Sequence, residues 1–320
     1  MKKVISLLLA TLMMLTLVSC GDTAADEDKV YEIGICQLVQ HPALDEATKG
    51  FKDALTEKLG DKVKFDEQNA SGEATNCTTI TSKFVSDKVD LIMANATDAL
   101  AAASQATADI PIVATSITDY ATALGISDWT GKTGFNVTGT ADLAPLAEQA
   151  AMLKELVPDA KNVGILYCSA EKNSKYQADV ITKELEALGM TVKVYTFVDT
   201  NDVTAVTQQM VTDACDAIFV PTDNTAASNT EAINNVLEPA KIPVIAGEEG
   251  ICKGCGIATL SISYYDIGYK AGEMAYEILV NGKDPADMEI EYAKELTKKY
   301  MADRAAAAGI TIPEGYEPIA

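Results

Sequence analysis

Asp90-Leu91-Ile92-Met93-Ala94, followed by Asn95-Ala96-Thr97-Asp98, is an apolar run that ends in a polar turn. Asp216-Ala217-Ile218-Phe219-Val220, followed by Pro221-Thr222-Asp223-Asn224, repeats that pattern in the second half of the chain. Short, continuously apolar runs of this kind are typical of strands that a parallel sheet buries on both faces. The chain therefore contains two copies of one α/β unit, and this repeat predicts the fold.

Matched stretches on both sides extend the repeat in the same order. Ile33-Gly34-Ile35 corresponds to Val163-Gly164-Ile165, and helical stretches near residues 44–59 and 174–188 follow them. Matched positions lie 126 to 132 residues apart throughout. Alternating strands and helices predict parallel α/β architecture, and the ordered repeat predicts two doubly wound parallel-sheet lobes. The remaining matched pairs are Val63–Phe65 with Val192–Tyr195, and Ile110–Ala114 with Ile242–Ala246.

The domain boundaries follow from where the chain would change lobe. After the glycine-rich stretch 247–256, a strand and the helical stretch Tyr265–Leu279 would return the chain to the first lobe. We expect residues 30–142 and about 258–286 in lobe 1, and residues 143–257 and about 287–320 in lobe 2. The chain would cross three times, which predicts a multi-strand hinge between the lobes.

The first twenty residues have the layout of a lipoprotein signal peptide. Lys2 and Lys3 precede an apolar run that ends in Leu17-Val18-Ser19-Cys20, too short for a membrane span. An ordinary signal peptide with an incidental cysteine is the alternative. The lipobox predicts diacylation of Cys20 and an extracytoplasmic protein anchored to the cell membrane by lipid, with the polar residues 21–29 as a tether.

Composition excludes several classes of function. A net charge of −22 argues against binding nucleic acid. One histidine and a lone CxxC, Cys252 to Cys255, give little support for a metal site, and a local disulfide or a free dithiol fits this pair better. Nucleophile, phosphate-loop and zinc-protease motifs are absent from the sequence, so we expect a binding protein without cofactor or metal rather than an enzyme.

The residues just after the strands are the candidates for a ligand site, because ligands of open α/β sheets bind beyond the carboxyl ends of the strands. Such residues are also common helix N-caps, which is the structural alternative. Helix-start amides near Thr97, together with Ser116, would bind a carboxylate, and Asp223 would bind an ammonium group. A zwitterionic amino acid carries both. The candidate ligand-binding residues are Gln37, His41, Ala96, Thr97, Asp98, Ser116, Asp119, Tyr120, Asn173, Ser174, Thr222, Asp223, Asn224, Gly247 and Glu248.

Several stretches together resemble the substrate-binding lipoproteins of ABC transporters, of the type I periplasmic-binding fold and the tryptophan/tyrosine-binding (TrpX-type) group. The match covers nearly the whole chain after the signal segment. The chain departs from the family pattern at Asp98 and Tyr120, where prolines are usual. The stretches that carry the resemblance are His41–Asp45, Gly50-Phe51, Ile110–Ile112, Thr118-Asp119, Asn136–Gly139 with Asp142, Glu171–Ser174, Pro221–Asn224, Tyr264–Gly268, Gly272 and Met274-Ala275.

The resemblance implies capture of a small solute, often an aromatic amino acid, and its delivery to a membrane permease. Tyr120 and Trp129 could supply a stacking surface for an aromatic ligand. We expect a monomer that closes on the ligand by hinge motion. A sugar or another solute bound by the same fold, and a surface enzyme, are the alternatives.

Overall fold

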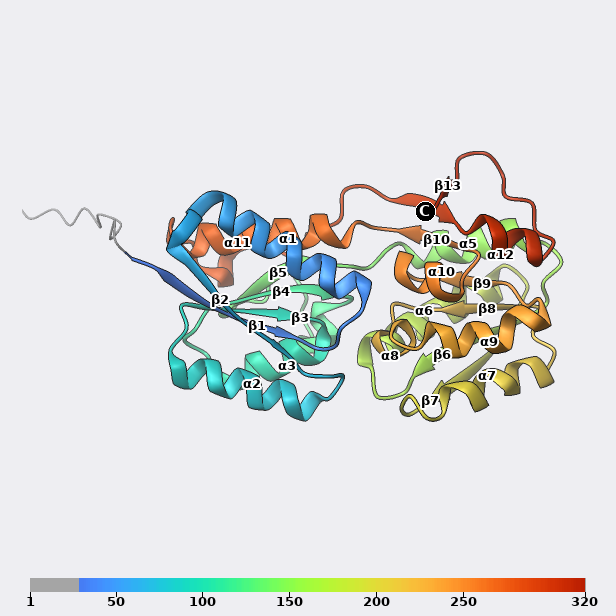
Figure 1. Ribbon diagram of the computed structural model, residues 1–320, viewed down its shortest axis with the longest axis horizontal. Helices are drawn as coiled ribbons and strands as arrows, with labels where there is room; N and C mark the ends of the chain where they lie inside the picture. Colours follow the sequence, from blue (N-terminus) through green and yellow to red (C-terminus); the bar gives the residue numbers. More distant parts are fainter. Residues whose placement is uncertain (1–28, 320) are drawn as a thin grey trace, which may run out of the picture.

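The computed structural model describes residues 29–319, which form two α/β lobes placed end to end (Figure 1). The predicted signal peptide, the predicted lipidation site Cys20 and all but the last residue of the predicted tether lie outside the described residues. Within the described part, no helix combines the length and the apolar character needed to cross a bilayer.

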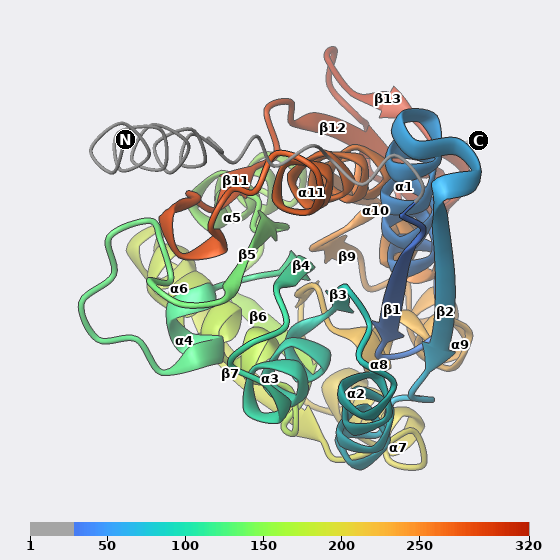
Figure 2. The same ribbon diagram turned by 90° about the vertical axis from the view of Figure 1, so that its left-hand side faces the viewer.

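Lobe 1 is built on a six-stranded sheet in the order β11-β5-β4-β3-β1-β2, and all its pairings are parallel. Helices α1 and α11 cover one face of this sheet, and α2 and α3 cover the other (Figure 2). The strands are β1 (Tyr31–Gln37), β2 (Val63–Asn69), β3 (Leu91–Asn95), β4 (Ile112–Ile117), β5 (Val137–Ala141) and β11 (Glu291–Tyr292). The helices are α1 (Pro42–Leu59), α2 (Ala74–Asp87), α3 (Thr97–Ala106), α4 (Tyr120–Leu124) and α11 (Tyr264–Leu279), with the short 3-10 turns η1 (Gly60–Lys62) and η2 (Pro285–Asp287).

Lobe 2 is built on a seven-stranded sheet in the order β13-β12-β10-β9-β8-β6-β7, parallel except for the antiparallel pair β10 and β12. Its helices also lie on both faces, with two hydrophobic clusters between them and the sheet. The strands are β6 (Asn162–Cys168), β7 (Thr191–Phe197), β8 (Ala217–Val220), β9 (Val244–Ala246), β10 (Ala258–Ser261), β12 (Thr297–Tyr300) and β13 (Glu317–Pro318). The helices are α5 (Leu146–Leu156), α6 (Lys172–Ala187), α7 (Val203–Thr212), α8 (Asn224–Ala227), α9 (Thr230–Ala240), α10 (Glu249–Cys255) and α12 (Ala302–Ala307).

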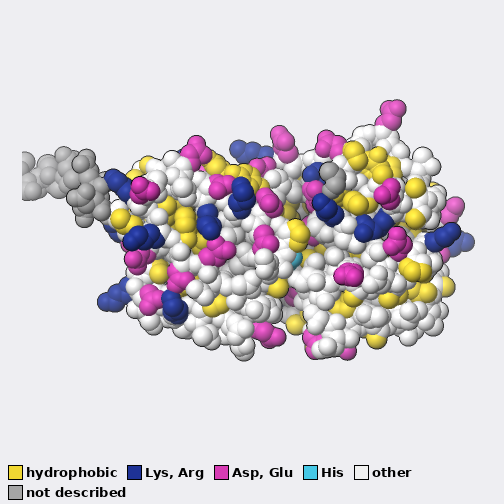
Figure 3. All heavy atoms as spheres, in the orientation of Figure 1, with side chains coloured by type: hydrophobic (Ala, Val, Ile, Leu, Met, Phe, Trp, Pro, Cys, Tyr) yellow, Lys and Arg dark blue, Asp and Glu magenta, His cyan; other side chains and the backbone are white. Residues whose placement is uncertain are grey.

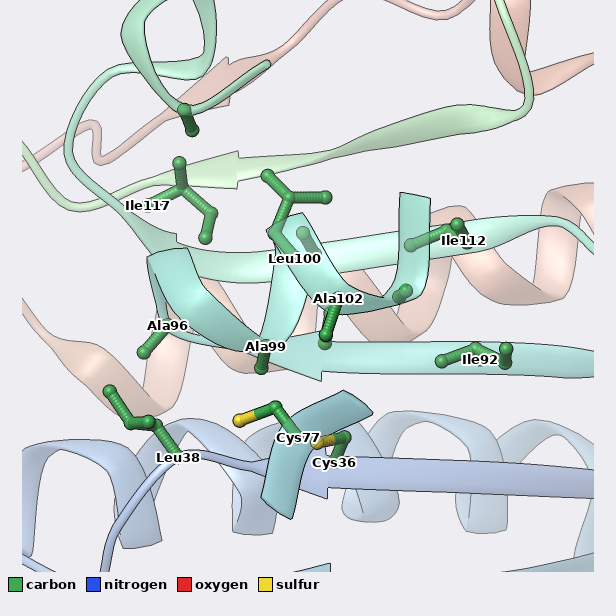
Figure 4. Close-up of a cluster of buried hydrophobic side chains, with 14 of the residues drawn as sticks. Cys36, Leu38, Cys77, Ile92, Ala96, Ala99, Leu100, Ala102, Ile112 and Ile117 are labelled. Carbon is green, nitrogen blue, oxygen red and sulfur yellow. The ribbon is translucent and has the colours of Figure 1, made fainter. Parts of the chain in front are cut away.

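The two sheets repeat one strand order, β4-β3-β1-β2 in lobe 1 and β9-β8-β6-β7 in lobe 2. Tyr31 pairs with Val63 and Gln37 with Asn69, a seven-residue register that β6 and β7 reproduce. The predicted fold of two doubly wound lobes is confirmed. Consecutive apolar residues fill the central strands, and in lobe 1 the side chains of Ile92 and Ile112 meet those of α3 in a hydrophobic core (Figure 4).

Three short segments join the lobes, at residues 142–145, 262–263 and 293–296. Two of the expected boundaries were wrong. Strand β10 belongs to lobe 2, because it pairs with both β9 and β12. The last crossing comes after residue 292 rather than near 287, because β11 still pairs with β5 of lobe 1. Residues Glu249–Cys255 of the glycine-rich stretch 247–256 form the helix α10.

Candidate functional site

The carboxyl ends of the strands of both lobes lie around a small cavity between the lobes. In the space-filling view the lobes meet along a seam, where the cyan of a histidine side chain is visible (Figure 3). Lobe 1 and the hinge segments contribute one part of the wall and lobe 2 the other. The lining residues are His41, Leu44, Ser116, Thr118, Asp142, Asn173, Thr222, Asp223, Asn224, Ala227, Glu248 and Tyr264.

Direct hydrogen bonds cross from one lobe to the other at this cavity. His41 Nε2 lies 3.1 Å from Asn224 Oδ1. Thr118 Oγ1 lies 3.5 Å from Thr222 Oγ1, and Gln177 Nε2 donates to Thr118 Oγ1 at 3.4 Å. These contacts require the lobes to be close together, so the structure is in a closed arrangement.

Two polar atoms at the cavity have no hydrogen-bond partner, the Nδ1 of His41 and the Oγ of Ser116. Both side chains are nearly buried, at 7% and 6% exposure. His41 directly precedes Pro42 at the start of α1, and burial lowers its pKa. Ser116 lies at an irregularity of β4 with φ at +58°, a conformation that costs energy for a residue other than glycine. Unpartnered polar groups in such a place are typical of a site that hydrogen-bonds a ligand.

Three buried carboxyl groups, of Asp142, Asp223 and Glu248, line the same cavity. Burial raises the pKa of each, and that of Glu248 to about 7. Two of them are also helix caps: Asp223 accepts from the amide of Ala226 at 2.7 Å, and Glu248 accepts from that of Gly250 at 2.5 Å. Among the lining residues of the described chain there is no lysine or arginine, so no fixed positive charge balances these carboxyls.

Glu171 organises the lobe 2 side of the cavity without lining it. Its Oε1 accepts from the backbone amide and the hydroxyl of Thr225, each at 2.8 Å. Its Oε2 accepts from the amide of Asn224 at 2.9 Å, from its side chain at 2.8 Å and from Asn173 Nδ2 at 3.1 Å. Because Asn224 is held at both its backbone and its side chain, its Oδ1 is presented to His41.

A second network joins the cavity to the hinge. Asp142 begins the first crossing segment, and Tyr264 begins α11 just after the second. Tyr264 donates its hydroxyl to Asp142 Oδ2 at 2.8 Å, and Thr118 donates to Asp142 Oδ1 at 3.2 Å. Since Thr118 also contacts lobe 2, this chain of hydrogen bonds runs from two hinge segments across the closed cleft.

The structure brings seven of the predicted site residues to the cavity wall, and their contact with a ligand stays a prediction. These are His41, Ser116, Asn173, Thr222, Asp223, Asn224 and Glu248. The others do not line it: Gln37, Ala96, Thr97, Asp98, Asp119, Tyr120, Ser174 and Gly247.

Tyr120 was predicted to contact the ligand, but the structure buries its side chain in lobe 1. It is 2% exposed, donates its hydroxyl to the carbonyls of Ala114 and Thr140, and stacks on Trp129 with ring centroids 6.4 Å apart. Both rings therefore pack the core of lobe 1 instead of facing the cleft. Asp119 caps α4 by accepting from the amide of Thr122, as the structural alternative expected.

The remaining residues outside the wall have partners or positions of their own. Gln37 donates to Asp45 and accepts from Thr48, which fixes the start of α1. The methyl of Ala96 lies in the hydrophobic cluster of Figure 4. Asp98 and Thr97 stand in the first turn of α3, beside the cavity rather than on its wall.

Sequence reasoning missed Leu44, Thr118, Asp142, Ala227 and Tyr264 as wall residues. For Thr118, Asp142 and Tyr264 a signal existed, because each follows closely after a strand, β4, β5 or β10. No helix starts directly after β5, so the helix-start signal does not mark Asp142. Tyr264 is the first residue of α11, and the sequence placed the start of that helix one residue later, at Tyr265.

Comparisons with known proteins agree with this architecture. A profile of the ABC transporter substrate binding protein family matches residues 32–316. The chain is 38% identical over 303 residues to a tyrosine-binding protein of Clostridioides difficile (strain R20291), covering 90% of this chain and 87% of that protein.

Two solved structures bear on the arrangement of the lobes. A Streptococcus pneumonia ABC domain in complex with L-Trp matches with a TM-score of 0.86 at 32% identity, covering 91% of this chain and 100% of that one. The ligand-free, open structure of a Clostridium difficile substrate binding protein matches with a TM-score of only 0.69 at 36% identity, covering 91% of this chain and 99% of that one. The closer fit to the complex despite the lower identity agrees with the closed arrangement seen here. The chain belongs to the ABC transporter substrate-binding protein family.

Proposed function

We propose that this protein captures an aromatic amino acid, tyrosine or tryptophan, and delivers it to the membrane permease of an ABC importer. The observation that carries the proposal is the polar cavity between the closed lobes, which is lined by the unpartnered groups of His41 and Ser116 and by three buried carboxyls. The names of the relatives support the ligand class, since one is a tyrosine-binding protein and another was solved with L-Trp.

Binding would proceed by closure of the lobes around the ligand. Lobe 1 offers the hydroxyl of Ser116 and the imidazole of His41 to the ligand's carboxylate, close to the N-terminus of the 18-residue helix α1. Lobe 2 offers Asp223 to the ammonium group. The closed form would then dock on the permease, and the protein itself would carry out no chemistry.

The proposed location is extracytoplasmic, with Cys20 carrying the lipid anchor and residues 21–29 acting as the tether. The small residues before Cys20 and the apolar run before them support it. Fractionation of cells that express the Cys20→Ala variant tests the anchor: the variant should leave the membrane fraction, whereas an unchanged distribution contradicts it.

Isothermal titration calorimetry with the amino acids, and with sugars as competing candidates, tests the ligand. Tyrosine or tryptophan should bind, and Asp223→Ala should remove detectable binding while the exposed Asp159→Ala behaves as wild type. Because Asp223 also caps α8, Ser116→Ala is a second variant whose side chain has no partner to lose. Binding of a sugar and of no amino acid would refute the proposal.

A further inference from the structure

Two thiols of lobe 1 lie against each other in the hydrophobic core. Cys36 is in β1 and Cys77 is in the first turn of α2, and both are free thiols at 0% exposure. The two side chains share a hydrogen bond, and this bond and burial raise the pKa of Cys36. Figure 4 shows both sulfurs between the strand and the helix, inside the hydrophobic cluster of this lobe.

The packing of α2 on β1 brings the two residues together. Gly34 lies two residues before Cys36 on the same face of the strand, and Phe84 lies seven residues after Cys77 on the buried side of the helix. The ring of Phe84 occupies the space that a Cβ at Gly34 would need, so the helix approaches the strand closely. A disulfide needs such an approach, because it joins Cα atoms only about 4.4–6.8 Å apart.

The equivalent interface of lobe 2 shows that this packing does not require thiols. There Gly164 of β6 meets Met210 of α7 in the same way. The residue two positions after the glycine is Leu166, and the residue seven positions before the methionine is Val203. Both are fully buried in one hydrophobic cluster, so two aliphatic side chains fill the place that two thiols fill in lobe 1.

Burial decides when the thiols can be oxidised. The thiolate is the reactive form, and neither its formation nor contact with an oxidant is favoured at Cys36 inside the core. An oxidant therefore reaches the pair before α2 packs on β1, or when α2 opens locally. Once a disulfide has formed, the same packing excludes reductants. Disulfides persist outside the cytoplasm, which is the proposed location of this protein.

We propose that Cys36 and Cys77 form a disulfide when the protein folds in an oxidising compartment, and that this bond fastens α2 to β1. The oxidant is an external organic disulfide. One cysteine thiolate attacks a sulfur of that disulfide, which releases one external thiol and leaves a mixed disulfide. The second cysteine thiolate then displaces the other external thiol. The protein S–S bond forms, the external disulfide is reduced to two thiols, and the two cysteine protons end on those thiols.

The disulfide would act beside the segment that leads to the ligand cavity. The loop before α2 donates from the amide of Ala70 to the carbonyl of Gln37 at 2.9 Å, and from the amide of Gly72 to that of Leu38 at 2.8 Å. Fastening α2 therefore also holds the chain between β1 and His41. The thiols themselves lie in the core and not on the cavity wall, so ligand affinity should not change.

Peptide mapping after refolding in reduced and oxidised glutathione tests the pairing. Free thiols are blocked, and the protein is digested with trypsin for mass spectrometry. Cys36 is the one cysteine of the tryptic peptide 30–49, and Cys77 is the one cysteine of the peptide 65–83. We expect these two peptides to be linked, and the link to persist when a reductant is added to the folded protein without denaturant.

Thermal unfolding measures the effect of the bond. It closes a loop from residue 36 to residue 77, and the oxidised protein should melt about 5–10 °C above the reduced protein. The variant Cys36→Ala should show no such difference. The matched control is Cys215→Ala, which removes a buried thiol of lobe 2 and should keep the difference.

Free Cys36 and Cys77 after oxidative refolding would overturn the inference. A disulfide between Cys252 and Cys255 alone would also overturn it, because oxidation would then select the CxxC pair. A Cys36–Cys77 bond without any rise in the melting temperature would refute its role in fastening α2. Peptide mapping on the wild-type protein decides the pairing even where Cys36→Ala does not fold. None of these results depends on the ligand, so the proposed function is tested separately.

Discussion

Replacing Glu171 by glutamine should destabilise lobe 2 and weaken ligand binding together. The carboxylate accepts five hydrogen bonds from three residues, all within 3.1 Å, in a site that is 6% exposed. Glutamine keeps one acceptor oxygen and directs an NH₂ group at donors that now lack a partner. At least two donors are left unsatisfied, at about 1–3 kcal/mol each.

One effect works in the opposite direction. Glu171 contributes to the raised pKa of Asp223, so removing its charge relieves repulsion between the two buried carboxyls. We therefore expect a net loss of about 2–4 kcal/mol in the free energy of unfolding, a large part of a typical total of 5–15 kcal/mol. Because Glu171 also orients Asn224 toward His41, ligand affinity should fall as well.

Urea denaturation followed by circular dichroism measures the stability, and calorimetry measures the affinity. The matched control is Glu186→Gln, an exposed position on α6, the helix that begins directly after Glu171. If the unfolding free energy of Glu171→Gln lies within about 0.5 kcal/mol of that control, the five hydrogen bonds do not hold this part of lobe 2 as argued.

Three further predictions concern other parts of the molecule. Burial raises the pKa of Glu248 to about 7, so the folded state holds an extra proton between about pH 5 and 7. Glu248 should lower the free energy of unfolding by about 3 kcal/mol as pH rises through that window. The raised pKa values of Asp142 and Asp223 act in the same direction, and the lowered pKa of His41 opposes them. Glu248→Gln should therefore make the pH profile of thermal unfolding shallower; an equally steep profile in the variant would contradict the assignment. Tyr120→Phe should lower the free energy of unfolding by about 1–2 kcal/mol, because the carbonyls of Ala114 and Thr140 lose a donor. Ligand affinity measured by calorimetry should not change. A large loss of affinity would show that Tyr120 does contribute to the ligand site. Arg304 is the one arginine of the chain, and its guanidinium donates to the carbonyls of Cys252, Lys253 and Gly254 at the end of α10. Arg304→Lys should lower the melting temperature by several degrees, because lysine cannot reproduce this set of hydrogen bonds. An unchanged melting temperature would show that a positive charge alone stabilises the end of α10.

The repeated pattern predicted the central strands and the order of elements because those features are local. Continuous apolar runs identify the buried strands, and the helical stretch expected near residues 44–59 is observed as α1, Pro42–Leu59. The hinge was less predictable for a physical reason. Strand β11 has two residues and β10 has four, and their membership of a sheet depends on partners far away in the sequence.

The candidate site could likewise be predicted where a local sequence rule applies, and could not be predicted where tertiary packing decides the direction of a side chain. The rule that ligand residues lie just after strands found Ser116, Asp223 and Glu248 at the cavity. It failed where a side chain turned back into its own lobe, as in Tyr120, whose ring fills the core while its hydroxyl finds two carbonyls. An aromatic residue after a strand suits a core as well as a ligand, and the direction of its side chain depends on packing that the sequence does not state.

In the closed arrangement, hydrogen bonds between the lobes favour closure and the buried carboxyls oppose it, so ligand binding can decide between the open and closed forms. Its cross-lobe hydrogen bonds at the cavity involve His41, Thr118 and Gln177, and two of the three measure 3.4 Å or more. At about 0.5–1.5 kcal/mol for a well-formed bond, together they contribute only a few kcal/mol toward closure. Burial of Asp142, Asp223 and Glu248, which raises the pKa of each, opposes closure at a pH where these groups are ionised. A ligand can shift the equilibrium between the open and closed forms only by binding one form more tightly. A ligand that contacts Ser116 of lobe 1 and Asp223 of lobe 2, as proposed, contacts both only when the lobes are closed, so the same contacts would recognise the ligand and select the closed form.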